Sequence, residues 1–364
     1  MTVDPAAGQA LGSSAPPAGT HQTHRALRDV KSHLRRSAVK LVGFLVAVYL
    51  VLRLIPALNQ ALTSLKSVSV GWLLGAIALE VLSETGFVFS WRRIVDPDKV
   101  LQRDGRGWRM DQRVAWAQLG GGLFVPGGNL GGMGVGGWIL HRFGMPTKVI
   151  AERQFNLSFL NTGVDALALV IFGVGLATGI FAGEDRLLLT LVPAAIAACG
   201  IAAGLFIAPR ANEYATRLEA KHAKVARTIR TLADAVNDTK RLFERRGWTT
   251  VLGSVAYLFF DLLILWLALV AVHANPTPAF AIVVMANIIG ALGGSLPLPA
   301  SIGTIGGIAG MLILYGVHHN PAVAAVVLHQ AIGLLVPLVG GTIAYFIIRR
   351  QLGPLPIGKR DGSG

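Results

Sequence analysis

The sequence predicts an all-α polytopic membrane protein with two inverted-topology repeats, about six full spans and two Gly/Pro-broken helical hairpins. Three observations predict this class. Hydrophobic residues make up 53% of the 364 residues and charged residues 14%, whereas soluble domains have roughly 25% charged residues. Apolar runs of about 20 residues recur along the chain, and each can cross a hydrocarbon core of about 30 Å. A glycine- and proline-broken apolar stretch occurs once in each half.

The N-terminal segment precedes the first apolar run. Residues 1–24 are rich in Ala, Gly, Pro, Ser and Thr and lack the apolar part of a signal peptide, so we expect a disordered leader. Residues 25–37 are basic, which is typical of a topology signal in contact with anionic headgroups. The net charge of +14 arises in such juxtamembrane segments without interleaved aromatic residues, so no nucleic-acid partner is expected.

Six apolar runs predict six full spans. A helix over about 20 residues extends about 30 Å, which matches the thickness of the hydrocarbon core. In chain order, the runs are 38–57, 71–91, 155–181, 187–208, 248–273 and 322–348.

Lysine and arginine concentrate in a few of the connecting segments. Because basic loops stay on the cytoplasmic side of a membrane, these segments are predicted to be cytoplasmic. They are 92–113, 209–247 and 349–360. The segments expected outside have few or no basic residues, and they are 58–70, 182–186, 274–278 and 318–320. Both termini, including the tail 351–364, are then predicted to be cytoplasmic.

The broken stretch reads LGGGLFVPGGNLGG from Leu119 to Gly132 and LGGSLPLPASIGTI from Leu292 to Ile305. Each copy is followed by an apolar run that contains several glycines, and then by an aromatic–Gly pair. By the charge pattern, 114–140 starts and ends inside, whereas 279–317 starts and ends outside. Each is therefore predicted to be a hairpin, either re-entrant or doubly spanning.

The count of crossings places the second half of the chain upside down relative to the first. We expect a first membrane repeat at 38–181 and a second at 187–350, with a cytoplasmic amphipathic helix within 209–247. That helix is expected on the inner leaflet or against a partner. Inverted repeats are typical of transporters whose site lies where the two broken elements meet.

The broken segments carry the predicted substrate site. A half-helix that begins inside the membrane presents free N–H groups and a positive dipole end, which favour an anion such as phosphate. The alternative interpretation is that the glycines only allow close helix packing. The predicted substrate-binding residues are Pro126, Gly127, Gly128, Asn129, Gly131, Gly132, Pro299, Ser301, Gly303 and Thr304.

Polar side chains inside the apolar runs form a second set of candidates. Glu80 and Glu84 lie four residues apart, on one face of a helix. Intramembrane acids usually face a cavity or a partner, so these two are expected either to bind a proton or cationic headgroup or to form a structural pair. The full set of intramembrane polar or coupling candidates is Glu80, Glu84, Arg153, Asp165, Asp261, Asn287, His329 and Gln330.

Cys199 is the single cysteine, which excludes disulfide bonds and cysteine-based metal sites. No His, Asp and Glu residues have the spacing of metal ligands. The sequence therefore predicts no metal, no cofactor and no catalytic residues.

Two signatures resemble a known family. Pro126-Gly127-Gly128, Gly131-Gly132 and a helix ending near Arg142-Phe143-Gly144-Met145-Pro146 resemble the first signature of the lysylphosphatidylglycerol synthase transmembrane-region family. Leu296-Pro297-Leu298-Pro299, Gly303 and Tyr315-Gly316-Val317 resemble the second. The resemblance covers roughly 38–352 and implies translocation or synthesis of membrane lipids. The soluble aminoacyl-transferase domain of the synthases is absent from this sequence, so lysyl transfer is not expected.

The chain departs from the family pattern at charged positions. Met133 and Gly136 stand where the family often has an acidic residue and an arginine, and Gly306 stands where it usually has a Glu. An arginine of the last span is replaced near His329–Gln330. We therefore expect the hairpins either to bind mainly through backbone N–H groups, Asn129, Ser301 and Thr304, or to serve chiefly for packing.

The predicted function is a lipid transporter of the bacterial inner (plasma) membrane, similar to a flippase or scramblase. It would move an anionic phospholipid or a polyprenyl-phosphate-linked glycolipid between leaflets, through a cavity between the two hairpins. One alternative is an integral-membrane lipid-modifying transferase, and another is a non-transporting scaffold subunit of envelope lipid synthesis. A homodimer or an envelope-enzyme partner is also consistent with the helix expected within 209–247.

Overall fold

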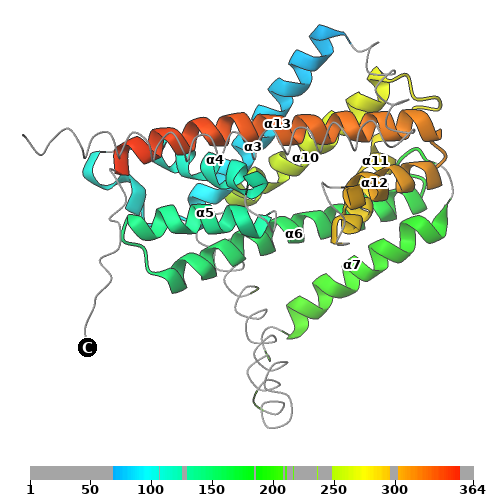
Figure 1. The fold of residues 1–364 in the computed structure, drawn as a ribbon. Helices are drawn as coiled ribbons and strands as arrows, with labels where there is room; N and C mark the ends of the chain where they lie inside the picture. Colours follow the sequence, from blue (N-terminus) through cyan, green and yellow to red (C-terminus); the bar gives the residue numbers. More distant parts are fainter. Residues whose placement is uncertain are drawn as a thin grey trace, which may run out of the picture. The chain divides into compact units, whose positions relative to one another are not determined.

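The computed structural model describes residues 69–105, 107–124, 129–183, 186–207, 210, 216, 236, 248–295 and 302–352. Throughout this part the regular secondary structure is helical, and its order can be followed in Figure 1. Several predicted segments lie outside the described residues. They are the leader 1–24, the basic segment 25–37, the first span 38–57, nearly all of 209–247 and the tail from 353 onward.

Five helices of the described part are long and apolar enough to cross a membrane. They coincide with the predicted spans that follow the first one, so the all-α polytopic class is confirmed. They are α3 (Val70–Ile94), α6 (Thr147–Ala177), α7 (Leu187–Ile207), α10 (Trp248–Ala271) and α13 (His319–Leu352).

Helix α6 begins eight residues before the predicted span 155–181. Its first turns carry charged residues such as Lys148 and Glu152, which are exposed. A helix of 31 residues extends about 46 Å, more than the hydrocarbon core needs. The apolar pattern identifies only the part of a helix that fits within the hydrocarbon core. The predicted span therefore omits the first turns of α6, which continue into the polar region.

Each predicted hairpin is a pair of helices. The first pair is α4 (Trp108–Phe124) and α5 (Asn129–Arg142), and the second is α11 (Phe280–Ala291), continued by the short 3-10 helix η3 (Leu292–Ser295), and α12 (Ile302–Leu314). Helices α11 and α12 have 12 and 13 residues and extend about 18 and 20 Å. Each is therefore shorter than a hydrocarbon core of about 30 Å.

Glycines let the two helices of each pair touch. A Cβ built on Gly132 of α5 would lie 2.5 Å from the carbonyl oxygen of Gln118 on α4. In the second pair, a Cβ on Gly307 of α12 would collide with the carbonyl oxygen of Gly290 on α11. Real Cβ atoms do not come so close, so a larger residue at either position would push the helices apart.

Helices α5 and α12 end in the same way. Gly144 has a φ of 90° and Gly316 a φ of 95°, in the left-handed region that favours glycine. The N–H of Met145 donates to the carbonyl of Leu140 at 3.2 Å, and the N–H of Val317 donates to that of Leu312 at 3.0 Å. The aromatic–Gly pair of each repeated stretch is thus a helix C-cap of the Schellman type.

Packing partners recur between the two halves of the described chain. Helix α4 packs against α5 and against α13, and α11 packs in the corresponding way against α12 and against α6. The equivalent helices α3 and α10 pack against each other. Helix α4 of the first pair therefore lies against α13 in the second half, and α11 of the second pair lies against α6 in the first half.

The contact between α3 and α10 is built from small residues. Gly86 and Gly253 face each other, since a Cβ on Gly86 would lie 2.7 Å from the carbonyl oxygen of Gly253. The Ser83 hydroxyl donates to the carbonyl of Tyr257 at 2.8 Å, and the Ser90 hydroxyl donates to that of Thr250 at 2.9 Å. Close approach and interhelical hydrogen bonds are the contacts that hold helices together in lipid.

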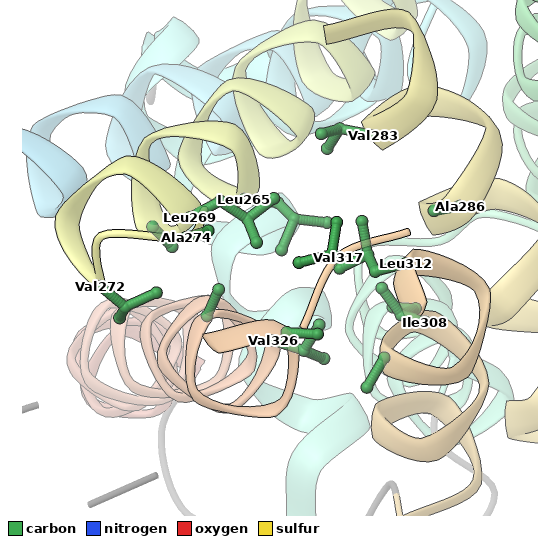
Figure 2. Close-up of a cluster of buried hydrophobic side chains, with 14 of the residues drawn as sticks. Leu265, Leu269, Val272, Ala274, Val283, Ala286, Ile308, Leu312, Val317 and Val326 are labelled. Carbon is green, nitrogen blue, oxygen red and sulfur yellow. The ribbon is translucent and has the colours of Figure 1, made fainter. Parts of the chain in front are cut away.

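Buried apolar side chains form two clusters. One joins α10, α11, α12 and α13, and Figure 2 shows side chains such as Leu265, Ile308 and Leu312 pointing toward one another in it. The other joins the end of α3 with α4, α5, α6 and the end of α13, around Trp91 and Met110. Each cluster is centred in one half of the chain and also includes residues of the other half.

Candidate functional site

The starts of α5 and α12 lie next to the predicted substrate-binding residues in the chain. Helix α5 begins at Asn129 and α12 at Ile302, each directly after a broken segment. Gly131 is buried in α5, whereas Thr304 is half-buried in α12. Pro126, Gly127, Gly128, Pro299 and Ser301 lie outside the described residues, and for Asn129 only the backbone is described.

Two of the predicted substrate-binding glycines have packing contacts. Gly132 touches the backbone of α4, as described above. The carbonyl oxygen of Gly303 lies where a Cβ on Gly293 would be. These contacts agree with the packing interpretation, and a substrate role of either glycine stays a prediction.

Polar residues from several long helices meet around Asp261 of α10. The Nε2 atom of His329, on α13, lies 2.8 Å from Oδ1 of Asp261, close enough for an N–H there to donate to the carboxylate. The amide of Asn287, on α11, donates to Oδ2 of Asp261 at 3.5 Å. One carboxylate thus links α10, α11 and α13.

Glu80 and Glu84 of α3 belong to the same site. Each side chain is 3% exposed. Glu80 is close enough to Asp261 and His329 to interact with both electrostatically, and Glu84 interacts with Glu80 and Asp261. In the described part of the chain, Oε2 of each glutamate is buried without a hydrogen-bond partner.

Asp165 and Tyr257 complete the site, which we call the carboxylate cluster: Glu80, Glu84, Asp165, Tyr257, Asp261, Asn287 and His329. Asp165, on α6, interacts electrostatically with Asp261. Tyr257 interacts with all four carboxylates of the cluster. It was not predicted from the sequence, although it lies four residues before Asp261 and therefore on the same face of α10.

The charges of the carboxylate cluster do not balance. Four carboxylates face one imidazole, and in the described part of the chain no Lys or Arg forms an ion pair with them. Two like charges at about 4 Å repel by about 4 kcal/mol at an effective dielectric constant near 20. A proton or cation bound in the cluster would reduce this repulsion. Among the described residues, no three His, Cys, Asp or Glu side chains are arranged to hold a metal ion.

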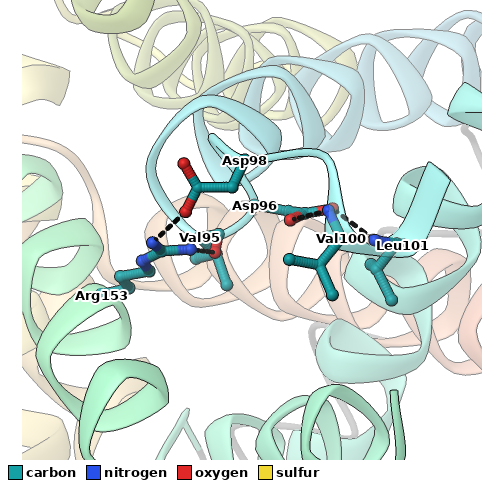
Figure 3. A network of polar contacts seen from close by, with 6 residues as sticks. All are labelled: Val95, Asp96, Asp98, Val100, Leu101 and Arg153. Atoms are coloured by element: carbon teal, nitrogen blue, oxygen red, sulfur yellow. Dashed lines mark hydrogen bonds and ion pairs between the residues drawn. The ribbon is translucent and has the colours of Figure 1, made fainter. Parts of the chain in front are cut away.

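Arg153 and Gln330 take no part in these contacts within the described residues. Figure 3 shows the Arg153 side chain reaching from α6 to the segment after α3. It lies 2.5 Å from Oδ2 of Asp98 and donates to the carbonyl of Val95 at 3.2 Å. Gln330 follows His329 on α13 and is half-buried. The structure thus gives Arg153 a role in anchoring a loop.

A buried carboxyl, Asp111, lies in the first turn of α4. It lies in the segment 92–113 that is predicted to be cytoplasmic. Its Oδ2 atom lies 3.0 Å from Nε of Arg92 and accepts a hydrogen bond from Gln102 at 2.5 Å. Burial raises the pKa of Asp111 to about 6, because the hydrogen bond from Gln102 and the charge of Arg92 only partly offset the lost hydration.

A buried amide network lies in the first half of the chain. The side chains of Gln118 and Gln154 exchange hydrogen bonds at 2.9 and 2.6 Å, and the indole of Trp91 donates to Oε1 of Gln118 at 2.8 Å. This network joins α3, α4 and α6. Sequence reasoning missed it, because an isolated glutamine in a helix gives no signal of its partner.

The model of the lysylphosphatidylglycerol synthase TM region family matches residues 39–341, which is most of the chain. No curated protein and no solved structure matched.

Proposed function

Since the chain belongs to the lysylphosphatidylglycerol synthase TM region family, we propose that it moves an anionic lipid between the leaflets of a bacterial inner membrane. The substrate would be an anionic phospholipid or a polyprenyl-phosphate-linked glycolipid. The membrane location and a lipid-related role follow from the family and from the five apolar helices. Transport itself is the step that we propose.

The observation that carries the proposal is the carboxylate cluster. Ionisable residues inside apolar helices are costly and mark pathways for substrates or ions. The cluster takes residues from both halves of the chain, with Glu80 and Asp165 from the first and Asp261 and His329 from the second. A site shared by two repeats is the arrangement expected of a transporter.

The short helix pairs support the same proposal. We propose that α4–α5 and α11–α12 are re-entrant hairpins that enter from opposite sides, because their helices are shorter than a full span. The N-termini of α5 and α12 would then hold the lipid phosphate through free backbone N–H groups. The recurring packing partners and the two Schellman caps fit repeats at 38–181 and 187–350.

A reconstitution experiment tests the proposal. The purified protein is placed in liposomes that contain a head-labelled anionic phospholipid or a labelled polyprenyl phosphate. A membrane-impermeant quencher then reports the lipid that reaches the outer leaflet, with protein-free liposomes as the control. We expect faster exchange of at least one anionic lipid than in the control. If no lipid exchanges faster, with or without a proton gradient, the transporter proposal fails.

The same sample separates the alternatives. A new lipid product in mass spectrometry would favour a lipid-modifying transferase. No exchange and no product, together with co-purification of an envelope enzyme, would favour a scaffold subunit. Homodimer formation can be read from the mass of the detergent-solubilised particle.

A further inference from the structure

We propose that the carboxylate cluster is a proton-binding site whose occupancy changes while a lipid crosses the membrane. This inference rests on the proposed transport function and names the coupling ion of the same site.

The cluster contains buried proton acceptors without partners. Oε2 of Glu80 and Oε2 of Glu84 have no hydrogen-bond partner in the described chain, although both side chains are 3% exposed. Nδ1 of His329 is likewise buried without a partner, while Nε2 of the same ring faces Asp261. When an imidazole carries its proton on one nitrogen, the other can accept a proton. An unpaired buried carboxylate oxygen is costly, and a proton on that carboxyl reduces the cost.

Titratable or polar groups from five helices face the site. Helix α3 contributes Glu80 and Glu84, α6 contributes Asp165, and α10 contributes Asp261 and the phenol of Tyr257. Helix α13 contributes the imidazole of His329, and α11 contributes the neutral amide of Asn287. With one imidazole among four carboxylates, uptake of a proton from water lowers the repulsion, and its release restores the charge.

Asp261 connects proton occupancy to the second helix pair. Its two oxygens contact His329 on α13 and Asn287 on α11. Helix α11 leads through η3 into the broken segment before α12. A proton that leaves His329 changes the contact between α10 and α13, and Asn287 on α11 shares the same Asp261 partner. The proton is taken from bulk water and returned to it, and only O–H and N–H bonds form or break.

Infrared difference spectroscopy of the full-length purified protein tests proton binding directly. Between acidic and alkaline samples, we expect a carbonyl band of a protonated carboxylic acid that Glu84→Gln weakens. Glu80→Gln serves as a second variant in case the first does not fold, which gel filtration detects. The matched control is Glu152→Gln, because the Glu152 side chain is 58% exposed and outside the cluster. An identical band in the control and in both cluster variants would overturn the proposal.

The transport assay supplies the second readout. If each transport step requires the binding or release of one proton, the rate of lipid exchange should change about tenfold per pH unit. In Glu84→Gln or His329→Gln, the exchange rate should depend less on pH. Exchange that continues at one rate at every pH would overturn proton coupling and leave the transporter proposal intact. A titrating band without any lipid exchange would instead defeat the transporter proposal. If ethylammonium at fixed pH abolishes the carboxylic acid band, the site binds organic cations and the proton proposal fails.

Discussion

Oδ1 of Asp261 and Nε2 of His329 lie 2.8 Å apart, although the residues are separated by 68 positions in the sequence. The contact joins α10 to α13 inside a site that also receives two glutamates from α3. Because His329 is the one basic side chain that the described residues place among these carboxylates, its loss should affect stability differently from the loss of a carboxylate.

His329→Gln should lower stability, and Glu84→Gln should not. Loss of the imidazole leaves a carboxylate without its partner, which costs roughly 1–3 kcal/mol. Loss of the Glu84 charge removes repulsion from Glu80 and Asp261, and this offsets any lost packing. The measurement is the thermal unfolding midpoint of each variant in the same detergent. A fall of equal size in both variants would contradict this account of the cluster.

Gly307→Ala should destabilise the second helix pair. The added methyl group would collide with the carbonyl oxygen of Gly290, and such overpacking typically costs about 1–3 kcal/mol. The matched control is Gly306→Ala on the adjacent residue, where a Cβ meets nothing within 4 Å. This control should be neutral or gain up to about 1 kcal/mol from helix propensity. Thermal midpoints in detergent measure both, and equal midpoints would be incompatible with the close contact.

The ends of the two helix pairs should face opposite sides of the membrane. Arg142 is the last residue of the first pair and His318 follows the second pair, and both are exposed. In a Cys199→Ser background, Arg142→Cys should react with an impermeant maleimide only after cells are opened. His318→Cys should react in intact spheroplasts. Labelling of both from the same side would disprove the inverted arrangement.

Asp111→Asn should reduce the loss of stability between mildly acidic and neutral pH. Burial raises the pKa of this carboxyl from 3.8 in the unfolded chain to about 6 in the folded protein. A raised carboxyl pKa contributes stability that is complete below pH 3.8 and is lost as the pH rises through about 6. Midpoints of the wild type and of Asp111→Asn, measured from pH 4 to pH 7, should therefore diverge in this window. Parallel curves would show that Asp111 does not titrate there.

Arg153 and Asp98 should couple weakly. Their ion pair is 2.5 Å long, but the Asp98 side chain is 60% exposed, and exposed pairs contribute about 0.2–1 kcal/mol. A double-mutant cycle of Arg153→Gln and Asp98→Asn, read as unfolding free energies, measures the coupling. A coupling energy of several kcal/mol would contradict the weak coupling expected of an exposed ion pair.

The helices themselves were largely predictable. Apolar length marked α3, α7 and α10 within a few residues, because crossing hydrocarbon requires a run that sequence shows directly. The Gly/Pro breaks marked the starts of α5 and α12 for a similar reason, since helix interiors disfavour both residue types. Nearly all of 209–247, where the amphipathic helix is predicted, and residues 125–128 and 296–301 of the broken segments lie outside the described residues, so these parts stay predictions.

The sequence by itself determined the class of protein, the long helices, the two broken helix pairs and most members of the carboxylate cluster. Each of these follows from local chemistry along the chain. Only the tertiary structure decided that Glu80, Asp261 and His329 meet, that Tyr257 joins them and that Arg153 does not. Helical periodicity gives the face on which a residue lies, but the choice of partner helix depends on close contacts such as Gly86 with Gly253, which form only when the helices pack.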